Sequence, residues 1–197
     1  MERVLELKQV VVTGGVASGK STVCQFLNDL GAYVVSADDI VHHLLTPDSP
    51  IGQQVIKLLG SQVVVEDHFD RAKIAQDVFS HRAHLEELEQ ILHPPLRQAI
   101  EQHVQIAKQQ GAPLFVAEIP LYFESKAPFS FEIVVVVQAP EDACRKRWTG
   151  HDFTARQSRL LPNEEKLQRA DVVLTNASTL QDLKKHVQTL YQSLTQE

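Results

Sequence analysis

"TGGVASGKST", residues 13–22, is the stretch that decides the fold. It follows a short β-branched run, Val10–Val12, and precedes a segment with helical periodicity. Within it, Gly14-Gly15-Val16-Ala17-Ser18-Gly19-Lys20-Ser21 matches the pattern G-x-x-x-x-G-K-[ST] in full and in the required strand–loop–helix context. The alternative, a glycine-rich turn that binds nothing, explains neither the full match nor the context. We therefore expect a phosphate-binding loop, or P-loop.

Each residue type in this loop has a separate physical role. Glycines allow the backbone to curl until successive N–H groups converge on one anion, and the following helix adds its positive end. Lys20 can reach the β- and γ-phosphates, and the Ser21 hydroxyl can ligate Mg²⁺. The predicted nucleotide site is therefore Gly14 to Thr22, with ATP and Mg²⁺ as ligands and Ser21 as the metal-binding residue.

The rest of the chain alternates strands and helices around this loop. A helical face after the loop ends at Gly31, and residues 32–36 form a second apolar strand. Three further strands are predicted at residues 113–120, 131–140 and 170–176, whose nearly continuous apolar character is typical of strands covered on both faces. We expect an α/β fold with three layers and a five-stranded parallel sheet.

Residues 39–110 have mostly helical patterns. One helix is predicted between Pro50 and Gly60, and another carries Leu85, Leu88, Ile91 and Leu92. The "HPP" at residues 93–95 is expected to end that helix and to begin the next one. The segment 63–71 is predicted to be a short extended stretch with a turn, and the last helix begins at Thr179, with Asp182 as its capping partner.

Composition narrows the function classes. A chain of 197 residues suits one domain with an inserted subdomain, and a net charge of −6 argues against broad nucleic-acid binding. The two cysteines, Cys24 and Cys144, form no CxxC pair and fit a reducing compartment. No signal-peptide pattern or long apolar run is present, which predicts a cytoplasmic protein without a membrane partner. No carboxylate–histidine set with metal-ligand spacing is apparent among the nine histidines.

The class of P-loop protein follows from what accompanies the loop. The N-K-x-D element of GTPases is missing, and the apolar strand "LFVAE" ends in Glu118, a weak version of the aspartate found in motor ATPases. A small-molecule kinase is favoured. Asp38 follows the second strand, where a carboxylate can accept the proton of an attacking hydroxyl. The alternative role, capping the next helix, is preferred for Asp39.

With these residues, the chain resembles the dephospho-CoA kinase family. Beyond the P-loop and "LGAYVVSAD", the resemblance is carried by segments spread along the chain: "DRAKIAQDVF" (70–79), "ILHPPLR" (91–97), "VAEIPLYFE" (116–124), "VVVVQAPEDACRKR" (134–147) and "EEKLQRADVVLTN" (164–176). It implies ATP-dependent phosphorylation of the ribose 3′-hydroxyl of dephospho-CoA, the last step of coenzyme A biosynthesis. It also implies a single P-loop kinase-like domain of three parts: a core (about 1–38, 111–140 and 167–197), a helical CoA-binding insertion (39–110) and a lid (141–166).

The resemblance also assigns roles to matching residues. Asp38 takes the place of the general base, and Arg147 and Arg156 fall on the lid, where guanidinium groups could stabilise the transferring phosphoryl. Asn176 matches a position near the adenine. The residues implied for the acceptor are Arg71, His93, Arg97, Leu121, Tyr122, Glu124 and Asp38 itself.

Three positions depart from the family pattern. Ser36 stands where an aspartate is common, His151 where an arginine is common and Leu160 where a glutamine is frequent. Two other functions stay open from the sequence. The first is a related nucleoside or nucleotide kinase, which would not account for the LHP, IPL and ADVV segments together. The second is a nucleotide-binding regulatory module with little transfer activity, in which the three departures are signs of decay.

Overall fold

The computed structural model describes residues 7–125, 129–150, 152–158 and 160–196. The chain divides into two compact units. The first, which we call the sheet unit, comprises Met1–Ser36 and His103–Glu197, and the second, the helical unit, comprises Ala37–Gln102. The insertion boundaries expected from the sequence, and the lid as a moving part, stay predictions.

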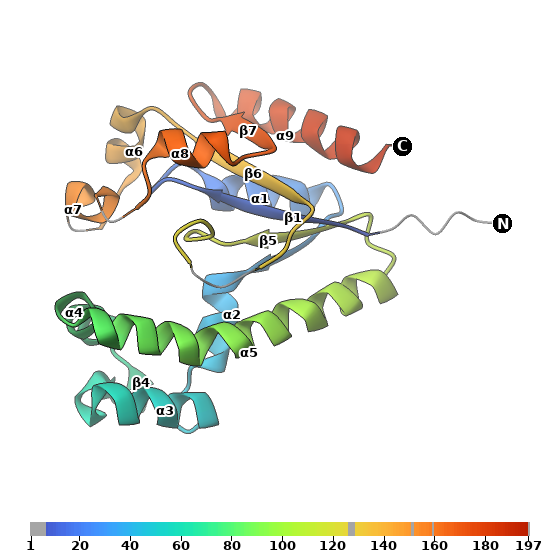
Figure 1. Cartoon of the computed structure of the whole chain (residues 1–197). Helices are drawn as coiled ribbons and strands as arrows, with labels where there is room; N and C mark the ends of the chain where they lie inside the picture. The colour runs from blue at the N-terminus through green and yellow to red at the C-terminus, as the bar shows by residue number, and fades with distance from the viewer. Residues whose placement is uncertain (1–6, 126–128, 151, 159, 197) are drawn as a thin grey trace. The chain divides into compact units, whose positions relative to one another are not determined.

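A five-stranded sheet forms the centre of the sheet unit (Figure 1). Its strands are β1 (Lys8–Gly14), β2 (Tyr33–Ser36), β5 (Leu114–Glu118), β6 (Ile133–Gln138) and β7 (Val172–Thr175), in the order β2-β5-β1-β6-β7. Every pair is parallel. The α/β fold and the parallel five-stranded sheet predicted from the sequence are thus confirmed. Each strand of the sheet ends at the same edge, so the residues after β1, β2 and β5 are neighbours.

Alternate side chains of the strands enter two buried layers. Val10 and Val12 of β1 pack with α1 (Lys20–Asp29) and α9 (Leu180–Thr195), whose apolar faces include Val23, Leu27 and Leu183. On the other face, Val11 and Phe115 are fully buried. Tyr33 stacks on Phe115, and its hydroxyl lies 2.8 Å from Nδ1 of His103, in the last turns of α5 (Arg82–Gln109). The central strands are therefore covered on both faces, as their continuous apolar runs predicted.

The helical unit contains α2 (Ala37–Leu44), α3 (Pro50–Leu59), the 3₁₀ turn η1 (Ser61–Val63), α4 (Arg71–Ser80) and the first part of α5. A short antiparallel hairpin, β3 (Val64–Val65) and β4 (His68–Phe69), confirms the extended stretch and turn expected there. This unit has its own apolar core, in which Val55, Leu59, Val63, Val78 and Leu88 are buried.

The helix break expected at residues 93–95 is wrong. Helix α5 continues from Arg82 to Gln109 with Pro94 and Pro95 inside it. A proline removes one helical hydrogen bond and crowds the preceding turn, which costs about 3 kcal/mol in an isolated helix. Here Leu88 is buried before the prolines and Leu96 and Ile100 after them. We attribute the continuity of α5 to this packing, which outweighs local propensity.

The remaining helices follow β6: α6 (Glu141–Arg147), α7 (Phe153–Gln157) and α8 (Asn163–Gln168). The last helix, α9, has Thr179 as its N-cap, and the Thr179 hydroxyl accepts a hydrogen bond from Asp182 N, as predicted. In the described residues, no helix combines the length and the apolar character needed to cross a membrane.

Candidate active site

The P-loop connects the end of β1 to the first residue of α1, Lys20. Two of its glycines are required by geometry. Gly14 has φ +146°, and a Cβ there would lie 2.1 Å from the carbonyl oxygen of Val137 on β6. Gly19 has φ +102°, and its Cβ would lie 2.4 Å from Asn176 Nδ2. Both positions combine a left-handed backbone with close neighbours, so only glycine fits.

Two polar groups of the loop are suited to a phosphate ligand. Lys20 Nζ donates to Gly15 O at 2.9 Å and to Gly14 O at 3.4 Å, which holds the ammonium group over the loop. Ser18 is 1% exposed, and its Oγ has no hydrogen-bond partner among the described residues. A buried hydroxyl without a partner is costly, and a phosphate oxygen would be a suitable acceptor for it. The loop therefore fits the triphosphate that its sequence predicts.

A carboxylate adjoins the predicted metal ligand. The Ser21 hydroxyl donates to Glu118 Oε1 at 2.8 Å. Glu118 is the last residue of β5 and is in register with Val12 of β1, so the strand pairing brings it beside the P-loop. Two hard oxygen ligands at this point suit Mg²⁺. Sequence reasoning did not include Glu118 in the site, although an apolar strand ending in a carboxylate was the available signal.

Asn176 braces the loop from the neighbouring strand. It is 8% exposed, and its side-chain amide donates to the carbonyl oxygen of Ser18 at 2.9 Å. Its backbone N–H donates to Gln138 O at 2.8 Å, which fixes the residue at the end of β7. The contact made by its side chain is thus with the loop backbone. Its predicted place near the adenine stays a prediction.

Helices α6 and α7 carry the two arginines predicted for the lid. Arg147 ends α6 and Arg156 lies in α7, and both side chains are exposed. An apolar cluster joins these helices to the P-loop: Val16, Cys144 and Phe153 are buried in it, with Ala17, Ala139, Trp148 and Leu160 around them. Arg145 adds hydrogen bonds to Glu141 and to Thr154 Oγ1. The arginine-bearing segment is therefore packed directly on the loop.

The segment after β5 carries three residues predicted for the acceptor. Leu121 is 42% exposed, and the Tyr122 hydroxyl donates to Phe129 O at 3.1 Å. Burial, with a smaller contribution from Asp171, raises the pKa of Tyr122 above its ordinary value.

Glu124, the third of these residues, forms an ion pair and a hydrogen bond with other residues of the chain. Its Oε1 lies 2.7 Å from Lys166 Nζ and accepts a hydrogen bond from Leu161 N at 3.0 Å. Lys166 is 1% exposed. Apart from this ion pair, neither Lys166 Nζ nor Glu124 Oε2 has a hydrogen-bond partner among the described residues. The pair fastens the segment after β5 to α8. The buried ion pair of Lys166 was not predicted, because the charged residues around it in the sequence are typical of a solvent-exposed helix.

The other predicted residues belong to the helical unit. Asp38 and Asp39 are exposed in the first turn of α2, which begins at Ala37. Asp39 therefore lies in the first turn of α2, and its role as the residue that caps this helix stays a prediction. Both carboxylates still favour the helix N-terminus electrostatically. Arg71 is exposed at the start of α4, directly after the N-cap residue Asp70.

His93 and Arg97 lie one turn apart on α5, and both are half-buried. Burial lowers the pKa of His93; Glu89 opposes this shift, and the positive charge of Arg97 adds to it. Arg97 Nε is buried and has no hydrogen-bond partner among the described residues. The structure thus brings together two of the predicted acceptor residues and leaves one buried guanidinium N–H without a partner among the described residues.

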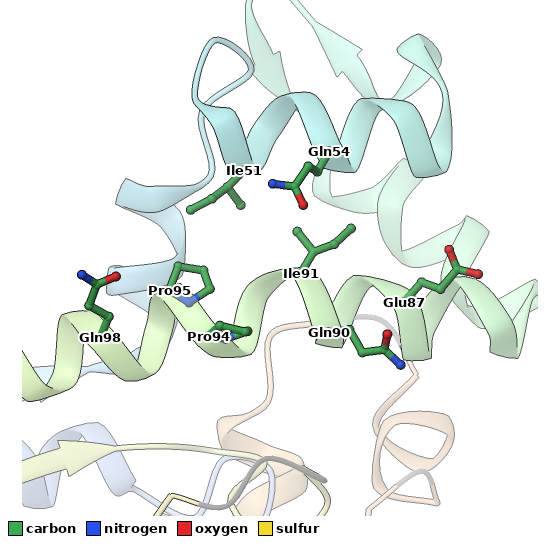
Figure 2. Close-up of a pocket in the computed structure, with 8 residues that line it drawn as sticks. All are labelled: Ile51, Gln54, Glu87, Gln90, Ile91, Pro94, Pro95 and Gln98. Atoms are coloured by element: carbon green, nitrogen blue, oxygen red, sulfur yellow. The ribbon is translucent and has the colours of Figure 1, made fainter.

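Figure 2 shows a pocket of about 500 Å³ in the helical unit, between α3 and α5. Its wall combines apolar side chains with amides and one carboxylate: Ile51, Gln54, Glu87, Gln90, Ile91, Pro94, Pro95 and Gln98. None of the predicted acceptor residues lines it. Pro94 and Pro95, expected to break a helix, instead form part of this wall.

Comparison with known proteins decides among the P-loop classes. The model of the dephospho-CoA kinase family matches residues 8–182. The chain belongs to the dephospho-CoA kinase family. It is 44% identical to a dephospho-CoA kinase of Chlamydia pneumoniae, over 96% of this chain and 98% of that protein.

Solved structures of similar proteins have the same fold. The protein TT1252 from Thermus thermophilus has a TM-score of 0.82 at 29% identity and covers 96% of this chain and 99% of its own. A dephospho-CoA kinase from Campylobacter jejuni has a TM-score of 0.70 at 27% identity, over 95% and 96% of the two chains.

Two of the three departures from the family pattern have a structural setting. Ser36 ends β2 in register with Glu118, so a hydroxyl lies on the strand next to the carboxylate that binds Ser21. Leu160 packs against the apolar cluster of Val16, Cys144 and Phe153, where a methyl-bearing side chain fits better than an amide. His151 lies outside the described residues. Neither of the two placed residues disrupts the P-loop.

Proposed function

We propose that the chain transfers the γ-phosphoryl group of ATP to the ribose 3′-hydroxyl of dephospho-CoA and so forms coenzyme A. The observation that carries the proposal is the complete P-loop at the end of β1, in a chain that the family model matches over residues 8–182. The hydrogen bond from Ser21 to Glu118 supports the proposal, because it places a carboxylate beside the proposed metal ligand.

The nucleotide half of the site is assigned to Gly14–Thr22. Loop amides and the Ser18 hydroxyl hold phosphate oxygens, and Lys20 moves from the loop carbonyls to the β- and γ-phosphates. Ser21 and Glu118 would hold Mg²⁺, which would neutralise charge on the phosphates. Asn176 keeps the loop in shape through Ser18 and adjoins the adenine.

Transfer requires a base and a positive environment. Asp38 accepts the proton of the 3′-hydroxyl as the oxygen attacks the γ-phosphorus in line, which contributes about 10²–10⁴-fold to the rate. Arg147 and Arg156 stabilise the negative charge on the transferring group. Because the segment that bears them packs on Val16 and Ala17, movement of the lid is coupled to the P-loop.

Acceptor binding is assigned to the residues that the family resemblance implies for it, Arg71, His93, Arg97, Leu121 and Tyr122. Arginines suit the phosphate groups of dephospho-CoA, because a guanidinium group binds phosphate oxygens in a bidentate manner. Arg97 is the strongest candidate, since its Nε lacks a partner among the described residues. Glu124 acts through its pair with Lys166, as a group that shapes the acceptor wall.

The composition of the chain supports a cytoplasmic location and a small-molecule substrate. Two unpaired cysteines fit a reducing cytoplasm, and a net charge of −6 favours a small-molecule substrate over nucleic acid. The functional division into core, helical CoA-binding insertion and lid is part of the same proposal.

A coupled assay of ADP release with a panel of acceptors tests the proposal. We expect ADP only when dephospho-CoA is supplied with ATP and Mg²⁺. Release with a nucleoside or nucleotide acceptor, and none with dephospho-CoA, would identify a different kinase. ATP binding without turnover on any acceptor would identify a regulatory module.

A further inference from the structure

A group of three metal-ligating side chains lies in the helical unit, at the junction of α4 and α5. Asp77 is in the last part of α4, His81 is the C-cap residue of that helix, and His84 is in the first turn of α5. One ligand atom from each lies within 4.8 Å of the others. The sequence-based expectation that no carboxylate–histidine set has ligand spacing is therefore wrong. Residues 77, 81 and 84 form such a set across the boundary between α4 and α5.

The three side chains already interact. His84 Nδ1 lies 2.5 Å from Asp77 Oδ1, and His81 Nδ1 lies 3.7 Å from the same oxygen. The two imidazole rings have centroids 4.9 Å apart. His81 Nδ1 is also 3.1 Å from the Asp77 carbonyl oxygen, so the backbone of α4 holds the first histidine near the second. One carboxylate oxygen is thus the common centre of the group.

We propose that Asp77, His81 and His84 bind one Zn²⁺ ion. Two imidazoles and one carboxylate form a ligand set suited to zinc and unsuited to Mg²⁺, which prefers oxygen ligands alone. With zinc–ligand bonds of about 2.0–2.2 Å, tetrahedral ligand atoms are about 3.3 Å apart. To reach this spacing, the longest separation in the group, at most 4.8 Å, shortens by up to about 1.5 Å, and the His84–Asp77 contact of 2.5 Å lengthens.

The three side chains are partly exposed to solvent, so a zinc ion can reach them and a water molecule can be its fourth ligand. The side chain of His81 is 59% exposed, whereas those of His84 and Asp77 are 33% and 21% exposed. The two less exposed groups form a fixed half-site, and His81 completes it from the solvent side. Water takes the fourth position. Zinc would take the place of the direct contact between His84 Nδ1 and Asp77 Oδ1, since a metal ion needs both atoms as deprotonated ligands.

The ion would tie α4 to α5 at the turn between them. The site is independent of the proposed transfer reaction, because none of its residues has been assigned to the nucleotide or the acceptor. Its test therefore needs neither ATP nor activity.

The experiment is zinc titration of the full chain, without a polyhistidine tag and stripped with chelator, followed by calorimetry and by metal analysis after dialysis. We expect one Zn²⁺ per chain at micromolar concentration and a raised melting temperature. His84→Ala, His81→Ala and Asp77→Asn should each weaken binding by at least about tenfold and abolish the thermal shift. Substitution with Co²⁺ should give visible absorption bands of a four-coordinate ion, lost in His81→Ala.

Two matched variants exclude other sources of binding. His68→Gln removes an exposed histidine of the same unit, and Ser21→Ala removes the candidate Mg²⁺ ligand; both should bind zinc as the wild type does. His81 is exposed, so His81→Ala keeps the test valid if His84→Ala unfolds. Absence of saturable binding in the wild type at micromolar zinc, or unchanged affinity in both His81→Ala and Asp77→Asn, would overturn the proposal.

Discussion

The Ser21 hydroxyl donates a hydrogen bond of 2.8 Å to Glu118 Oε1 and so links the first turn of α1 to the end of β5. The pairing of β5 with β1 fixes this relationship, because Glu118 is in register with Val12. Under the proposed function, the carboxylate beside Ser21 would give Mg²⁺ a second oxygen ligand. The link therefore connects sheet topology to the chemistry of phosphoryl transfer.

Replacement of Glu118 should raise the Mg²⁺ requirement of the kinase. We expect Glu118→Gln to lower activity at limiting Mg²⁺ by about 10–100-fold, the usual effect of losing a group that supports a metal ligand. Excess Mg²⁺ should recover part of this loss. Glu132→Gln, at an exposed carboxylate next to β6, is the control and should behave as the wild type. Identical Mg²⁺ dependence in Glu118→Gln and the wild type would contradict the assignment.

Loss of the Asn176 amide should loosen the P-loop. Asn176→Ala leaves the buried Ser18 carbonyl without its donor, which costs about 1–3 kcal/mol of unfolding free energy. We also expect KM for ATP to rise, since the loop amides lose their fixed orientation. Urea unfolding and initial rates measure the two effects, with exposed Asn28→Ala as the control. If Asn176→Ala matched Asn28→Ala in both, the bracing role would be wrong.

The ion pair of Lys166 and Glu124 should matter far more than a similar pair on the surface. Lys166→Met leaves the largely buried charge of Glu124, 15% exposed, without its partner, so we expect a loss of about 3–5 kcal/mol. Arg169→Met removes a pair with Glu165 in which both side chains are about half exposed, and should cost less than about 1 kcal/mol.

Chemical denaturation of both variants checks this contrast. The double variant Glu124→Leu with Lys166→Met should recover much of the stability, because no buried charge remains. Equal losses in Lys166→Met and Arg169→Met would show that burial of the pair contributes nothing.

The pKa of His93 predicts a pH-dependent stability. Because burial lowers this pKa in the folded state, the unfolded chain binds the proton more readily near pH 6.5. Above the pKa that His93 has in the unfolded chain, this residue does not affect the stability of the wild type. As the pH falls from there toward the lower pKa of the folded chain, the wild type loses stability. His93→Gln removes the penalty, so its stability relative to the wild type should increase on acidification from pH 7. A pH-independent difference between the two unfolding free energies would refute the shift.

Much of this architecture was predictable because its signals are local. The P-loop pattern, the apolar strands and the cap at Thr179 each depend on residues close in sequence, and each was found where expected. The place of Glu118 beside Ser21 depends on a strand order in which β5 lies between β1 and β2. That order brings together residues 97 apart, which no local pattern specifies.

The misreadings have the same cause. Pro94 and Pro95 predict a helix end by local rules, yet packing on both sides of them maintains α5. Lys166 looks like a solvated charge until its partner Glu124, on a distant segment, is known. The group of Asp77, His81 and His84 was missed because its ligand atoms meet at the junction of two helices, which residue spacing alone does not specify.

The most direct measurement is the single-turnover rate of γ-phosphoryl transfer to dephospho-CoA by Asp38→Asn, at saturating ATP and Mg²⁺, with Asp39→Asn as the matched control. We predict that Asp38→Asn lowers this rate by about 10²–10⁴-fold and leaves the dissociation constant of ATP unchanged, while Asp39→Asn transfers at nearly the wild-type rate. A rate for Asp38→Asn within a few-fold of the wild type would contradict the account, because the carboxylate after β2 would then not be the base.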